Sequence, residues 1–184
     1  MDIAQLQKQF VDVVVSIYRQ NFLDDQYAQL RQLEDESNPD FVVEVVMLFF
    51  EDSERIIDCL TTAMQQQIVD FKQVDAIAHQ FKGSTSSVGA QRVKNACLCM
   101  RTLCEQENLD GCLQCLQLIR NEYFLVKSGL EAIINMEQQI MAAGGTIPAF
   151  SVGMDASPEG SRRFLEFWVK NASGFGHKEL VYLN

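Results

Sequence analysis

Proline and glycine are scarce in this chain. Its 184 residues include only 3 prolines and 10 glycines, while leucine, glutamine, valine, glutamate and alanine are common. The common residues lose little freedom in a helix and the two helix breakers are rare, so the composition favours helices over strands. With 47% hydrophobic residues, the chain can form one core and carry an extension.

Long apolar runs and positive charge are also lacking. No apolar run reaches the roughly 20 residues of a membrane span, and the start of the chain, Met1–Gln5, has no basic segment leading into an apolar one. We therefore expect a soluble intracellular protein without membrane insertion. The 15 lysines and arginines stand against 25 acids, a net charge of -10, which makes a nucleic acid an unexpected partner.

Cysteine, in contrast, is not rare. Without a secretory signal, a disulfide framework is not expected. Cys112 and Cys115 have the spacing of half a zinc site, but no second pair matches it. We interpret the cysteines as small buried hydrophobes or free thiols and expect no bound metal, with a zinc- or redox-responsive protein as the alternative. The six cysteines are Cys59, Cys97, Cys99, Cys104, Cys112 and Cys115.

Apolar residues recur at helical spacing in six segments. Ser37-Asn38-Pro39-Asp40 predicts the start of the third helix, with a side-chain cap, proline at the first helical position and an acid at the positive end of the dipole. Gly89 and the pair Gly144-Gly145 are expected to end two later helices. The segments are 2–22, about 25–35, about 40–66, the helix that carries His79, 91–106 and 108–142.

Short connections between the last four helices imply antiparallel neighbours. The predicted fold is all-α, an antiparallel up-down four-helix bundle with two short N-terminal helices capping it. The last helix should face inward with Leu109, Cys112, Leu116, Ile119, Tyr123, Val126, Leu130 and Ile133.

The chain changes character after Pro148. Residues 151–184 have no sustained periodicity, and their four acids and four bases cancel, so the whole net charge belongs to residues 1–150. We expect a helical-bundle domain over 1–150 and a loosely packed C-terminal extension over 151–184. A partner-binding or self-docking segment is the alternative, because Phe164–Val169 forms a short apolar cluster.

His79 is one of only two histidines, and the other, His177, lies in the extension. At about 100° per residue, His79 is roughly 160–200° around its helix from Ile77 and Phe81, which should face the core. An exposed neutral imidazole with a cation one turn away and room beside it suits a phosphoryl acceptor. The face of His79 also carries Asp75, Lys82, Gly83 and Ser86.

The charges near His79 support this interpretation. The segment 72–101 contains five bases and one acid, whereas 24–58 contains eleven acids and two bases. A basic island suits an acidic docking partner, such as an aspartate-lined metal pocket. A surface histidine beside a lysine is nevertheless common, and spacing alone leaves a structural role open.

Other chemistry is sparse. The Ser84-Thr85-Ser86-Ser87 run allows close helix packing, and its hydroxyls can bond back to the helix carbonyls, so none is expected to be a nucleophile. The sequence has no glycine-rich phosphate loop, no histidine pair spaced to ligate a metal and no Ser/His/Asp arrangement.

Two longer runs, His79–Ser84 and Ser86–Cys97, resemble the core motif of plant-type histidine-containing phosphotransfer (HPt) proteins. The resemblance covers about residues 1–150. It extends to Asp35–Val42, Leu48–Ser53, Glu122-Tyr123, Leu125–Lys127, Glu137–Ile140 and Ala143–Gly145.

The resemblance implies that His79 takes a phosphoryl group from the receiver-domain aspartate of a hybrid histidine kinase and passes it to that of a response regulator. Such a carrier is not an enzyme on its own and binds no cofactor, because the receiver domain supplies the Mg²⁺. The family serves cytokinin signalling in the cytoplasm and nucleus. Lys82 would stabilise phosphoryl charge and Gly83 would keep the docking surface open, while Gln80, Ser86 and Arg101 would flank the site.

Two departures from the family pattern, Phe81 and Thr85, are mild and lie on the inward side. Some members lack the histidine and act as decoys, a role that His79 disfavours. The alternative function is a non-catalytic helical adaptor that binds receiver domains without transferring phosphate.

Overall fold

Six helices account for most of the fold. The computed structural model describes residues 2–149, and over that range it has no β-strand, only an isolated bridge between Asp35 and Asn38. None of the helices in this range is both long and apolar enough to cross a membrane. The helices are α1 (Ile3–Arg19), α2 (Asp25–Gln32), α3 (Phe41–Met64), α4 (Phe71–Val88), α5 (Gln91–Glu105) and α6 (Leu109–Ala142).

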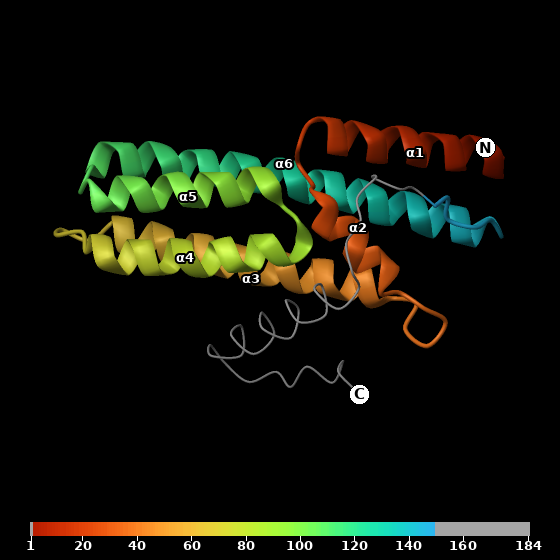
Figure 1. Ribbon diagram of the computed structural model, residues 1–184, viewed down its shortest axis with the longest axis horizontal. Helices are drawn as coiled ribbons and strands as arrows, with labels where there is room; N and C mark the ends of the chain where they lie inside the picture. Colours follow the sequence, from red (N-terminus) through yellow and green to blue (C-terminus); the bar gives the residue numbers. More distant parts are fainter. Residues whose placement is uncertain (1, 150–184) are drawn as a thin grey trace.

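The last four helices form the predicted up-down bundle (Figure 1). Each packs against the next along the chain, and α3 also contacts α6, which closes the bundle. All six helices were predicted, with ends that differ from the expected ones by a few residues.

The N-terminal helices do not simply cap the bundle. With 34 residues, α6 is more than twice as long as the 15-residue α5, so α5 covers only part of it. The C-terminal part of α6 is covered instead by α1, which runs antiparallel to it: Ile17 lies beside Gly129 and Ile3 beside Gly145 (Figure 1). The short α2 packs on α4.

The predicted apolar stripe of α6 is buried with one exception. Leu109 was expected to face inward but is 41% exposed. It is the first residue of α6, directly after the cap Asn108, and its side chain is not covered by the bundle there. The other seven predicted inward residues of this helix are buried.

The cap of α3 was predicted wrongly. The helix begins at Phe41, and neither Ser37 nor Asn38 caps it. Instead, the Asp35 carboxylate accepts hydrogen bonds from the backbone N–H groups of Ser37 and Asn38, which closes a turn before the helix. The backbone N–H of Val42, in the first turn of α3, donates to the Glu34 carboxylate at 3.0 Å. Because the Glu34 carboxylate reaches this first-turn donor from outside the helix, a local serine or asparagine cap is unnecessary.

Gly89 ends α4 as predicted, in a left-handed conformation with φ of 75°. A Cβ at this position would meet the Asp24 carboxylate and lie 2.9 Å from the backbone nitrogen of Tyr27. The backbone N–H of Asp24 donates to the Gly89 carbonyl at 2.9 Å. The turn between α4 and α5 is therefore pressed against the start of α2.

The predicted division at residue 150 stays a prediction. Residues 150–184 lie outside the described range, and with them His177 and the apolar cluster Phe164–Val169.

Candidate functional site

The middle of α4 presents His79 to solvent. His79 is exposed, whereas Ala78 and Phe81 are fully buried and Ile77 is partly buried against the core. The angular argument from the sequence therefore describes α4 correctly. The Asp70 carboxylate caps the helix by accepting from the backbone N–H groups of Lys72 and Gln73, while Gly89 ends it, so the backbone under His79 lies well inside a regular helix.

Gly83, one turn beyond His79, leaves open space. A Cβ built at this glycine would meet no atom within 4 Å, and its φ is not positive. Neither packing nor backbone geometry requires glycine here, although glycine in a helix interior costs roughly 0.5–1 kcal/mol relative to alanine. The absence of a side chain gives an approaching group access to the helix beside His79.

Three of the four hydroxyl groups in the run 84–87 donate to carbonyls of their own helix. Thr85 and Ser86 both donate to the Lys82 carbonyl at 2.8 Å, and Ser87 donates to the Ser84 carbonyl. Ser84 is buried, and its Oγ has no hydrogen-bond partner within residues 2–149. Back-bonding of this run was predicted, and it supports the expectation that none of these hydroxyls is a nucleophile.

The basic island is partly neutralised. Arg92 binds Glu122 on α6, with Nε 2.7 Å from Oε2, and its guanidinium also lies 4.3 Å from the centre of the Phe22 ring. Arg101 on α5 donates through Nε to Asp75 on α4 at 2.9 Å. Lys82, half-buried, forms no ion pair with any residue of the described range, so its charge is available beside His79.

The pair between Asp75 and Arg101 was missed by sequence reasoning. Both residues had been singled out, Asp75 on the face of His79 and Arg101 as flanking the site, but nothing in the spacing joins them. The hydrogen bond to Asp75 raises the pKa of the Arg101 guanidinium, which stays charged. Gln80, also predicted to flank the site, is half-buried next to His79.

The cysteines lie mostly in the seam between α5 and α6, and no three His, Cys, Asp or Glu side chains of residues 2–149 are grouped to hold a metal ion. Cys97 and Cys112 are fully buried, and Cys104 lies with its Sγ 3.9 Å from that of Cys112. Burial raises the pKa of Cys115 to about 11 and that of Cys104 to about 12. These thiols therefore behave as buried hydrophobes, as predicted, while Cys59 and Cys99 are exposed.

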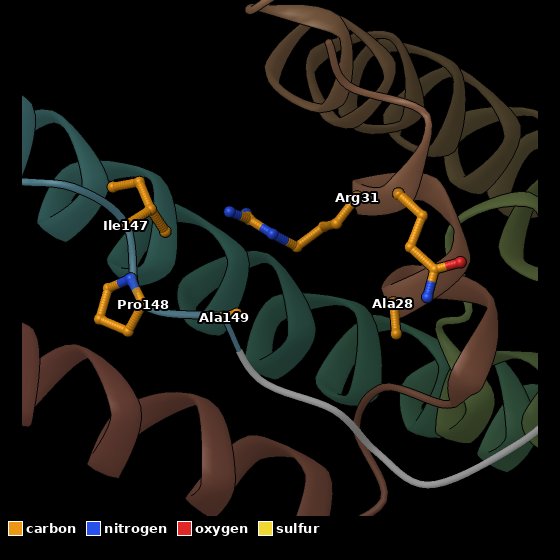
Figure 2. Close-up of a pocket in the computed structure, with 6 residues that line it drawn as sticks. Ala28, Arg31, Ile147, Pro148 and Ala149 are labelled. Atoms are coloured by element: carbon orange, nitrogen blue, oxygen red, sulfur yellow. The ribbon is translucent and has the colours of Figure 1, made fainter.

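A cavity of about 220 Å³ lies away from α4, between α2 and the chain after α6 (Figure 2). The Arg31 side chain extends from α2 toward Ile147 and Pro148 (Figure 2), and its guanidinium is bound by the Glu137 carboxylate. Desolvation raises the pKa of Glu137 despite this partner. The cavity contains no residue of the His79 site.

Within residues 2–149, the fold and the site thus define a helical bundle with one histidine, His79, exposed in the middle of α4. The Hpt domain model matches residues 44–136. Histidine-containing phosphotransfer protein 1 of Arabidopsis thaliana is 54% identical over 153 residues, which span 83% of this chain and 99% of that protein.

Two solved structures of plant phosphotransfer proteins are also similar to this chain. A histidine-containing phosphotransfer protein from Medicago truncatula is similar with a TM-score of 0.73 and 45% identity, over 77% of this chain and 96% of that one. One from maize is similar with a TM-score of 0.70 and 43% identity, over 73% of this chain and 99% of that one. The chain belongs to the family of histidine-containing phosphotransfer proteins.

Proposed function

We propose that this protein is a phosphorelay carrier, in which His79 receives a phosphoryl group from the receiver-domain aspartate of a hybrid histidine kinase and delivers it to that of a response regulator. The observation that carries the proposal is the exposed imidazole at mid-α4, beside the open space at Gly83, in a chain of this family.

The transfer balances without a further reactant. A neutral ring nitrogen of His79 attacks the phosphorus of the donor's aspartyl phosphate, forming an N–P bond as the P–O bond to the aspartate breaks. The aspartate leaves as a carboxylate, and the imidazolium can release its ring proton to water. Reversal of these events on a second receiver returns the phosphoryl group to an aspartate.

Each flanking residue has a role that its position supports. Lys82, one turn from His79 and without an ion-pair partner in the described range, stabilises the charge of the phosphoryl group. Gly83 leaves room for the receiver domain to approach. Gln80 and Ser86 border the site, although the Ser86 hydroxyl already donates to the Lys82 carbonyl.

The partner contributes most of the catalysis. No carboxylate of residues 2–149 forms a hydrogen bond or ion pair with His79, so the imidazole has no general base of its own. The receiver domain brings the acceptor carboxylate and a Mg²⁺ ion, which lowers the cost of developing charge on the phosphoryl oxygens. We therefore assign a carrier role without stand-alone enzymatic activity, in cytokinin signalling between cytoplasm and nucleus.

The test mixes the protein with a phosphorylated receiver domain and follows acid-labile label. His79→Gln should accept none, because the nitrogen that bonds phosphorus is gone, whereas His177→Gln, which removes the chain's other histidine, should match the parent. Label on His79→Gln at the parent level would overturn the proposal. Receiver binding without any transfer by the parent would show an adaptor instead.

A further inference from the structure

Asp75 is an acid in an unfavourable place for a phosphoryl acceptor. It precedes His79 by four residues on α4, so the two side chains lie on one face, with Cβ atoms roughly 5–6 Å apart. It is also the single acid in the segment 72–101. A phosphoryl group on His79 brings about two negative charges next to this carboxylate, and their repulsion acts against the phosphorylated form.

Arg101 moderates that repulsion. Its Nε donates to Asp75 Oδ1 at 2.9 Å, across the α4–α5 contact, with about a third of each side chain exposed. Within residues 2–149 the two terminal nitrogens of Arg101 have no hydrogen-bond partner. The guanidinium thus neutralises part of the Asp75 charge and keeps its terminal donors free beside a residue that lies one helical turn from His79.

We propose that Asp75 sets the transfer potential of phosphorylated His79, and that Arg101 limits the effect by pairing with it. The inference rests on the proposed carrier function and deepens it. Asp75 touches no reacting atom; it is a positioning residue whose charge makes His79 release the phosphoryl group more readily. Arg101, shared between the carboxylate and the phosphoryl oxygens, keeps the phosphorylated form from becoming too unstable to populate.

Removing the Asp75 charge acts on phosphorylated His79 in two ways, and both stabilise it. Asp75→Asn keeps an oxygen that can accept from Arg101, so the contact between α4 and α5 is retained. The change removes the repulsive charge and leaves the full Arg101 charge to the phosphoryl group. Arg101→Gln does the reverse, because it removes a cation and unmasks Asp75. Exposed charges at this separation act through solvent, so each change is expected to be about three- to fivefold.

The experiment measures the equilibrium distribution of phosphoryl groups between His79 and the aspartate of an isolated receiver domain, at concentrations where the two proteins are mostly unbound. Under that condition the ratio reports transfer potential and not docking affinity. Asp75→Asn should raise the share on His79 about three- to fivefold, and Arg101→Gln should lower it comparably. Arg101→Lys, which keeps the charge, should recover most of the loss.

Charge specificity has a matched control. Asp12→Asn removes one negative charge from the exposed face of α1, where Asp12 has no ion pair within the described range, and should leave the ratio unchanged. The Asp75→Asn effect should also shrink as salt rises from about 0.05 to 0.5 M. In Asp75→Asn/Arg101→Gln, which lacks both charges, the share on His79 should lie between those of the two single variants.

An unchanged or lowered share of label on His79 in Asp75→Asn would overturn the inference, as would an equal rise in Asp12→Asn. Failure of the proposed function gives a different result, because the parent would then accept no label at all. Circular dichroism of each variant should match the parent, since both side chains of the pair lie at the surface.

Discussion

Gly83 is a residue at which stability and access to the site oppose each other. A Cβ here meets no atom within 4 Å, so Gly83→Ala should raise the free energy of unfolding by about 0.5–1 kcal/mol, measured by chemical denaturation. Gly83→Leu should keep most of that gain but slow phosphoryl transfer, because its side chain fills the space beside His79. A loss of helicity in either variant would contradict the open position of Gly83 on α4.

The residue scale also shows where sequence reasoning succeeds. Periodicity alone assigned His79 to the outer face of α4 and Phe81 to the core, because both follow from a single helix angle. It could not join Asp75 to Arg101, since that pair depends on how α4 and α5 rotate against each other. The open space at Gly83 was inferred from residue type, but only the surrounding atoms establish that a side chain would fit.

At the scale of elements, the turn between α4 and α5 is held by its contact with α2. Gly89→Ala should cost about 2 kcal/mol or more of unfolding free energy, because the left-handed backbone is strained with a Cβ and that Cβ also collides with Asp24 and Tyr27. Gly144→Ala is the matched control. Its φ of 79° carries the same strain, but no atom lies within 4 Å.

Thermal or denaturant unfolding of the two variants separates strain from collision. Gly144→Ala should cost only about 1 kcal/mol, the strain alone. Equal losses in both would mean that the start of α2 does not press on Gly89.

The presence of each helix was predictable from the sequence, but the capping of helix ends and the packing of helices against one another were harder to predict. All six helices follow from the spacing of apolar residues. The predicted cap of α3 was wrong because the Glu34 side chain binds the first-turn donor of Val42, while Asp35 closes a turn before the helix. The position of α1 along α6 was not foreseen, because it pairs segments more than a hundred residues apart and no local pattern encodes that contact.

For the whole molecule, partly buried acids give stability an unusual dependence on pH. Desolvation raises the pKa values of Asp24, Glu34 and Glu137 above the ordinary values of these carboxyl groups. The folded state then binds these protons more tightly than the unfolded state does. Their contribution to stability is therefore lost as the pH rises from the ordinary carboxyl pKa, about 4, through the raised folded value.

Glu34→Gln tests this dependence, because its amide oxygen can still accept from the Val42 N–H while the ionisation is gone. Its free energy of unfolding should exceed that of the parent at pH 7, by less than about 1 kcal/mol since solvent screens the half-exposed charge. Near pH 4 the two should converge. A variant less stable than the parent at pH 7 would show that the charge itself helps to cap α3.

The pairing of α1 with the far end of α6 also has a consequence for synthesis. The first helix to be made packs on α6, the last helix of the described range: Ile17 must wait for Gly129, and Ile3 for Gly145. At about 10 residues per second, the apolar face of α1 stays uncovered for roughly ten seconds after it leaves the ribosome. The bundle of α3 to α6 closes through contacts between consecutive helices, whereas α1 docks only after nearly all of the described chain has emerged. Newly made chains thus pass through a stage in which α4, with His79, is complete before α1 has packed against α6.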